Sequence, residues 1–295
     1  MNGDSDREPV EDRAHPRGRA PRPVSAGRTV VVIAVVCVAG GGAALAVRTA
    51  QGPSAARAVA VDSSLTEQCD AVPASAVRTT FTSTDGDRLG AALVGQGNPG
   101  PAVVLRHGAS QTICDWLPWA DELQRRTDAE VALYDRRGSG SSGHLASAGG
   151  GDAQDAADLV AVAEALAARV GTERPRQLVT ASSSRGTRST HAALDDLTRV
   201  DGVEHCAWVA VSPVLSSTAD LPTAHGERTP VLTLAWETER ADVAATVPVL
   251  AAAAALSRWT VAETSVDTDD HSLALVRDHP VAAQAVVAAV RGCDG

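Results

Sequence analysis

The stretch Leu178-Val-Thr-Ala-Ser-Ser-Ser184-Arg-Gly-Thr-Arg-Ser-Thr-His191 places an apolar strand directly before a turn of small residues and a helix. The small residues Ser182 and Gly186, two positions before and after Ser184, allow the backbone to fold this sharply. A helix beginning at Arg185 would place free N–H groups and a positive dipole end beside the serine hydroxyl. The pattern therefore predicts a nucleophile elbow that presents Ser184 for acyl transfer. The alternative is a serine-rich turn without a catalytic role.

The N-terminal part of the chain differs from the rest in composition. Residues 1–28 are rich in proline, arginine and acidic residues without apolar periodicity, which predicts a disordered tail. Residues 29–47 carry no charge and lie between Arg28 and Arg48, which predicts a signal peptide or an uncleaved membrane anchor. Residues 48–64 would form a linker, and residues 65–295 a single folded domain. Both alternatives for residues 29–47 place this domain outside the cytoplasm, either at the cell membrane or secreted.

Charge and cysteine content narrow the function classes. The net charge of -10 argues against a nucleic-acid partner, because phosphate binding needs a concentrated basic surface. No Cys/His spacing typical of a metal site occurs, and we expect neither a metal nor a cofactor. Outside residues 29–47 four cysteines remain, an even number that favours two disulfides in an oxidising compartment: Cys69, Cys114, Cys206 and Cys293. Three connectivities are possible, and buried free thiols are the alternative.

Strand-like and helix-like segments alternate from about residue 65 onward. The expected strands are Val77–Ser83, Arg88–Val94, Ala102–Leu105, Glu130–Tyr134, Gln177–Ala181, Ala207–Val211, Val231–Ala235 and Trp259–Ser265. The expected helices are Trp116–Arg126, Ala153–Val170, one from Arg185, Val243–Ser257 and Pro280–Val290. This order predicts a mostly parallel, eight-stranded α/β sheet with helices on both faces. Ligands of such sheets bind at the carboxyl ends of the strands.

Four sequence motifs follow one another along the chain at the ends of expected strands, at that edge of the sheet. They are His107-Gly108, the segment Asp135-x-Arg137-Gly-x-Gly140-x-Ser142, the elbow at Ser184, and Asp270-His271. With these motifs the chain resembles the α/β-hydrolase family over roughly Val77 to Arg291. The stretch Cys114-Asp-Trp-Leu-Pro-Trp-Ala120 also resembles exported actinobacterial members with a cysteine near the start of the domain. Export and this resemblance favour Cys69 paired with Cys114, and we expect Cys206 to pair with Cys293.

The resemblance implies a catalytic triad. Ser184 would be the nucleophile, and His271, directly after the last strand, would be its base, with His225 as the second candidate. The acid should lie nine residues past Pro230, at Glu239, and its neighbours Asp242 and Glu237 are the alternatives.

The resemblance also implies an oxyanion hole. Its donors would be the backbone N–H of Arg185 and one N–H from the Gly108-Ala109 turn. Three arginines at strand ends, Arg106, Arg136 and Arg185, would favour an acidic substrate group if they face the cleft, although exposed arginines are usually only solvated.

The expected function is hydrolysis of a small-molecule acyl ester by a monomeric serine hydrolase. Only residues 214–229 separate the sixth and seventh strands, so we expect little or no lid and an open cleft. The rival is an inactive binding domain with the same fold, tethered at the cell surface. Its support is Ser182 where the family has glycine, Glu239 where it has aspartate, and the crowded serines.

Overall fold

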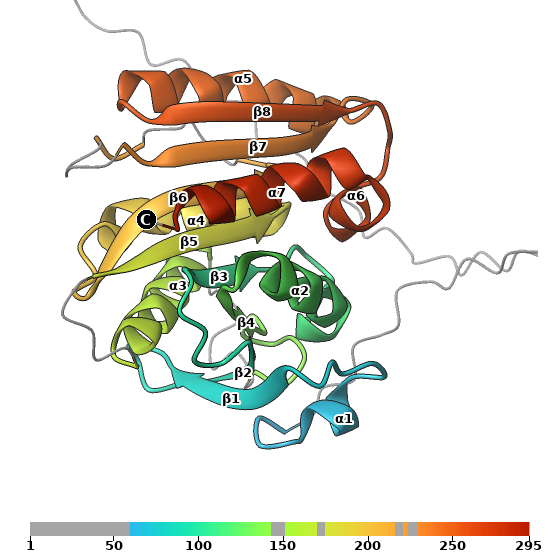
Figure 1. Ribbon diagram of the computed structural model, residues 1–295, viewed down its shortest axis with the longest axis vertical. Helices are drawn as coiled ribbons and strands as arrows, with labels where there is room; N and C mark the ends of the chain where they lie inside the picture. The colour runs from blue at the N-terminus through green and yellow to red at the C-terminus, as the bar shows by residue number, and fades with distance from the viewer. Residues whose placement is uncertain (1–59, 143–150, 170–174, 216–220, 224–228, 295) are drawn as a thin grey trace, which may run out of the picture. The chain divides into compact units, whose positions relative to one another are not determined.

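The computed structural model describes residues 60–142, 151–169, 175–215, 221–223 and 229–294. Its eight strands form one sheet in the order β1-β2-β4-β3-β5-β6-β7-β8, with helices on either side (Figure 1). The strands are β1 Ala76–Thr82, β2 Arg88–Val94, β3 Ala102–Arg106, β4 Glu130–Tyr134, β5 Arg176–Ser183, β6 Val203–Val211, β7 Val231–Glu237 and β8 Thr260–Val266. The helices are α1 Leu65–Gln68, α2 Ile113–Thr127, α3 Asp152–Ala167, α4 Arg185–Leu197, α5 Ala241–Leu256, α6 Leu273–Asp278 and α7 Pro280–Gly292.

The sheet is antiparallel at one end and parallel elsewhere. β1 and β2 form a hairpin around Asp85-Gly86, where Gly86 takes a φ of 87° that glycine adopts without strain. β2 also pairs antiparallel with β4, whereas β4, β3, β5, β6, β7 and β8 pair in parallel. The parallel strands therefore end at one edge, where the loops after β3, β5, β7 and β8 carry the predicted site residues.

Two apolar cores fill the two faces of the sheet, because successive side chains of a strand point to opposite sides. On β5, Leu178 packs into the core shared with α3, α4 and α5, while Val179 packs into the core shared with α2, α6 and α7. Figure 1 shows α7 lying across β6 and β7 on this second face. The central strands are buried on both faces, which explains why they read as continuous apolar runs.

Both predicted cysteine pairs are present as disulfides. Cys69, directly after α1, is bonded to Cys114 in the first turn of α2. Cys206 in β6 is bonded to Cys293, which follows α7. The bonds close chain separations of 45 and 87 residues, so they join both ends of the domain to its interior.

Several sequence predictions lie outside the described residues. These are the tail at 1–28, the segment at 29–47, most of the linker at 48–64 and most of the 214–229 connection on which the open cleft depends. Among the residues that the structure describes, no helix is both long and apolar enough to cross a membrane.

Candidate active site

The predicted elbow forms at the junction of β5 and α4. Ser184 lies between the last residue of β5 and the first residue of α4, with φ 48° and ψ −125°, a strained conformation for a residue with a side chain. A Cβ atom on Gly186 would lie 2.8 Å from the carbonyl oxygens of Arg106 and His107. Only glycine therefore allows α4 to pack this closely against the end of β3, which explains the small residue two positions after the serine.

Ser184 contacts the predicted base. The Oγ atom of Ser184 lies 2.8 Å from Nε2 of His271, and Nδ1 of His271 lies 2.5 Å from Oε1 of Glu237. With Glu237 ionised, His271 donates its Nδ1 hydrogen to the carboxylate and leaves Nε2 to accept the serine hydrogen. Glu237 is fully buried at the end of β7, and His271 is partly exposed. Three side chains that are distant in the sequence thus form one hydrogen-bonded series of hydroxyl, imidazole and carboxylate.

Glu239, the residue predicted to be the acid, does not contact His271. The contact is made by Glu237, one of the two alternatives. Its side chain is exposed, and its backbone N–H donates to the Thr268 carbonyl at 3.4 Å. Asp242 is exposed as well and pairs with Arg240 at 2.9 Å. The strand β7 extends to Glu237 instead of ending at Ala235, so the carboxylate that reaches His271 belongs to the strand itself and not to the following loop.

A buried hydroxyl holds the other oxygen of Glu237. Ser212, fully buried after β6, donates from Oγ to Oε2 of Glu237 at 2.6 Å and accepts from the N–H of Ser272 at 2.8 Å. Ser212 and Ser272 have φ values of 48° and 59°, and Ser184 has a φ of 48°. Ser184 and the two serines beside Glu237 and His271 therefore all have a strained backbone. Sequence reasoning missed Ser212 and Ser272, because a lone serine after a strand carries no distinctive signal.

The oxyanion hole has two candidate donors. The backbone N–H groups of Arg185 and Ala109 have no acceptor among the described residues. Gly108, which was also predicted, is not available, because its N–H donates to Oε1 of Gln111 at 3.0 Å. Oε1 of Gln111 also accepts from Nε1 of Trp116 at 3.1 Å, so the Gln111 side chain links the Gly108 turn to helix α2. Gln111 was not identified from the sequence.

His107 shapes this turn as a neutral imidazole. Its Nε2 accepts the N–H of Arg136 at 3.3 Å, which leaves a hydrogen on Nδ1 to donate to the Gly108 carbonyl at 2.8 Å. Burial lowers the pKa of His107 to about 3, and the charge of Arg106 lowers it too. The ring therefore fixes the turn without titrating in the physiological range.

The remaining predicted groups have structural partners or lie elsewhere. Asp135 accepts hydrogen bonds from Ile113 and Ser141. Arg137 binds Asp158 at 2.7 Å. The second candidate base, His225, lies outside the described residues. No cluster of His, Cys, Asp and Glu among the described residues could hold a metal ion.

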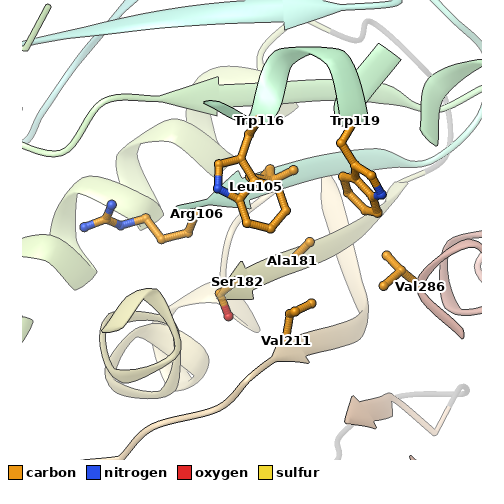
Figure 2. A pocket seen from close by; sticks show the side chains of 8 residues that line it. All are labelled: Leu105, Arg106, Trp116, Trp119, Ala181, Ser182, Val211 and Val286. Atoms are coloured by element: carbon orange, nitrogen blue, oxygen red, sulfur yellow. The ribbon is translucent and has the colours of Figure 1, made fainter. Parts of the chain in front are cut away.

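Ser182 occupies the position where the α/β-hydrolase family has glycine. Its Oγ accepts the Nε1 hydrogen of Trp208 at 2.8 Å, and both side chains are buried. Figure 2 shows Ser182 and Ala181 at one side of a small pocket whose opposite wall is formed by Trp116 and Trp119. The hydroxyl is thus bound to a tryptophan and does not contact the triad.

Comparison with known proteins supports the architecture. No protein-family model and no curated protein sequence matches the chain. Three solved structures among those similar to it are a Pyrococcus furiosus esterase, the thermostable carboxylesterase EstE1 from a metagenomic library, and a hormone-sensitive lipase from a metagenome library. In that order, their TM-scores are 0.55, 0.59 and 0.54, and each has 16% sequence identity with this chain. The matched regions cover 75%, 76% and 76% of this chain, and 91%, 91% and 87% of the solved chains. The chain has the α/β-hydrolase fold, and the predicted fold class is confirmed.

Proposed function

We propose that this protein is a serine hydrolase that cleaves carboxylic esters through an acyl-enzyme intermediate. The observation that carries the proposal is the convergence of Ser184, His271 and Glu237, with distances of 2.8 and 2.5 Å between their reacting atoms. The fold alone would be compatible with many functions. Esterases and a lipase among the similar structures favour ester substrates.

The reaction follows from these contacts. His271 takes the hydrogen of Ser184 while Oγ attacks the ester carbonyl, and Glu237 stabilises the imidazolium. The N–H groups of Arg185 and Ala109 would bind the oxyanion of the tetrahedral intermediate, assisted by the dipole of α4. His271 then protonates the leaving alcohol, which leaves the acyl group on Ser184. Water activated by the same imidazole releases the acid and restores the serine.

The inactive binding domain is less well supported than the enzyme. The three sequence arguments for the binding domain lose weight, because Ser182 is bonded to Trp208, Glu237 contacts His271, and Ser183 accepts from Ser272 at 2.9 Å. A binding domain has no need for a serine, a histidine and a buried carboxylate in hydrogen-bonded series. A strained serine conformation at their centre is a further cost that binding alone does not require.

A fluorophosphonate probe tests the mechanism without knowledge of the substrate. We expect covalent labelling of the purified protein, mapped by mass spectrometry to Ser184 and abolished in Ser184→Ala and His271→Ala. Circular dichroism would check that both variants remain folded. Absence of labelling in folded wild-type protein would refute the proposal, and labelling that survives Ser184→Ala would refute the choice of nucleophile.

We further propose that the hydrolase domain is extracytoplasmic, either anchored by residues 29–47 or secreted after cleavage there. Two disulfides support this location, because such bonds persist in oxidising compartments. A reporter fused after Gly295 should be active only if it is a type that works outside the cytoplasm. Activity of a cytoplasmic reporter at the same position would contradict this location.

A further inference from the structure

Two arginines contact the carboxylate of Asp155, and the charge of a third, Arg185, acts on it. Nη2 of Arg106 lies 3.1 Å from Oδ2 of Asp155, and Nη1 of Arg136 lies 3.8 Å from the same oxygen. Burial raises the pKa of Asp155, and the charges of Arg106, Arg136 and Arg185 each lower it. The three guanidinium groups are therefore close enough to Asp155 to act on one another.

The charges of this cluster do not balance. Arg106 is almost fully buried and makes the shorter contact, so Asp155 compensates Arg106 first. The neighbouring Asp152 already pairs with Arg188 at 2.7 Å. Among the described residues Arg136 has no closer ion pair than 3.8 Å and Arg185 has none, so about two positive charges remain uncompensated.

The two uncompensated arginines repel each other. Burial lowers the pKa of Arg136, the charges of Asp155 and, more weakly, Asp152 raise it, and the charges of Arg185 and Arg106 lower it further. The Nε atom of Arg185 is buried without a hydrogen-bond partner. Binding of an anion would lower the free energy of such a site, because the anion offsets the repulsion between the two positive charges and accepts hydrogen bonds from guanidinium N–H groups.

The location of these groups connects them to the reaction. Arg185 directly follows Ser184, and its N–H is one of the two candidate oxyanion donors. The N–H of Arg136 donates to His107, whose other nitrogen fixes the Gly108 carbonyl in the oxyanion turn. Both side chains are partly exposed, whereas Arg106 is not, so only Arg136 and Arg185 could contact a substrate.

We propose that Arg136 and Arg185 form a subsite for a negatively charged group of the substrate, a carboxylate or a phosphate, with Arg106 neutralising Asp155 behind them. Guanidinium groups suit this role, because their planar N–H donors bind two oxygens of such a group at once. The subsite rests on the proposed ester hydrolysis and specifies its substrate class. A net charge of -10 on the whole chain would repel such a substrate, so local positive charge at the cleft would also aid its capture.

Rigid charged and neutral ester pairs test the subsite. For the acyl side we would compare the p-nitrophenyl esters of 4-carboxybenzoic acid and 4-carbamoylbenzoic acid, and for the alcohol side 4-acetoxybenzoate and 4-acetoxybenzamide. We expect kcat/KM to favour the charged member of at least one pair, and Arg136→Gln and Arg185→Gln each to reduce that preference about tenfold. Arg136→Lys should retain part of it. The matched control is Arg199→Gln, which removes an exposed arginine paired with Asp196 beyond the C-terminal end of α4 and should leave the preference unchanged.

The outcomes separate this proposal from the proposed function. Hydrolysis of both members without preference, or a preference that survives both variants, would overturn the subsite and leave the esterase intact. If no ester is hydrolysed, calorimetric titration of Ser184→Ala with terephthalate and with phenyl phosphate still tests the subsite. Binding that is weakened about tenfold by adding Arg136→Gln would support it and show which anion fits, and no binding of either would overturn it.

Discussion

The Nδ1 atom of His271 lies 2.5 Å from Oε1 of Glu237, although Glu237 still belongs to β7 and not to the loop after it. The longer side chain of glutamate extends from the end of the strand to the imidazole. Its second oxygen is held by Ser212 at 2.6 Å, so the carboxylate is fixed on both sides while fully buried. Arg240, 3.6 Å from Oε1, adds a positive charge on the solvent side.

The first prediction compares Glu237→Gln with Glu239→Gln. An amide at residue 237 can donate to Nδ1 of His271 and thereby favour the wrong tautomer, so we expect ester turnover to fall about 10³- to 10⁴-fold. Glu239→Gln changes an exposed side chain and should alter kcat by less than about twofold. Steady-state kinetics on one activated ester measures both. A larger loss in Glu239→Gln would refute the triad described here.

The second prediction concerns Ser212→Ala. It removes the donor to Oε2 of Glu237 and frees the carboxylate to move, so we expect kcat to fall about tenfold with little change in KM. Ser189→Ala is the matched control, since that buried hydroxyl donates to the Gly186 carbonyl within α4 and lies outside the triad. An equal effect of both variants would indicate a general loss of packing.

The fold was largely predictable from the sequence, because the central strands are short apolar segments bounded by turn residues. β2 and β4 match the predicted residues, and the other strands differ only at their ends. The short helices α1 and α6 were missed, since segments of four and six residues show no complete helical period. The hairpin of β1 and β2 and the mostly parallel arrangement were predicted, because a two-residue turn joins antiparallel strands and helical crossovers join parallel ones. The antiparallel pairing of β2 with β4 was not predicted, since these strands are not consecutive in the chain.

The site was predictable only where a motif carries it. Ser184 and His271 each stand at a position that the order of elements defines, and the structure brings their side chains into contact. The predicted acid, Glu239, lies two residues past the carboxylate that contacts His271, because counting from Pro230 assumes a strand that ends before residue 237. The supporting contacts of Ser212 and Gln111 arise only when distant loops meet, so no local pattern announces them.

The third prediction concerns the disulfide between Cys206 and Cys293. It closes a separation of 87 residues, and the loss of such a cross-link frees the unfolded chain, which the chain-entropy treatment values at about 4–5 kcal/mol. We expect the double variant Cys206→Ala/Cys293→Ala to lower the free energy of unfolding by about 2–5 kcal/mol in urea. Non-reducing peptide mapping of wild-type protein should recover the bonded pair. Recovery of Cys69 joined to Cys206, for example, would refute the pairing.

The fourth prediction concerns acid sensitivity. Burial lowers the pKa of His107 to about 3 and that of His205 to about 4, whereas the pKa of histidine in the unfolded chain is about 6.5. Below pH ~6.5 the unfolded chain therefore binds more protons, so stability present above that pH is lost as the pH falls toward 4. Each histidine should contribute about 1.4 kcal/mol per pH unit in this range. Urea unfolding at several pH values measures the slope, and His205→Gln should make it shallower; an unchanged slope would contradict the assignment of His205.

The fifth prediction concerns Ser182→Gly, which introduces the glycine that the α/β-hydrolase family has at this position of the elbow. Nε1 of Trp208 would lose its acceptor inside the core, so we expect the free energy of unfolding to fall by about 1–3 kcal/mol. The rate of fluorophosphonate labelling should stay within about threefold of wild type, because the Ser182 hydroxyl does not contact Ser184, His271 or Glu237. Ser182→Ala is the control, since it removes the same hydrogen bond without adding backbone freedom. If Ser182→Gly instead raised labelling by orders of magnitude while Ser182→Ala did not, the wild-type turn would be too rigid for acylation, and the inactive binding domain would become the better description of this protein.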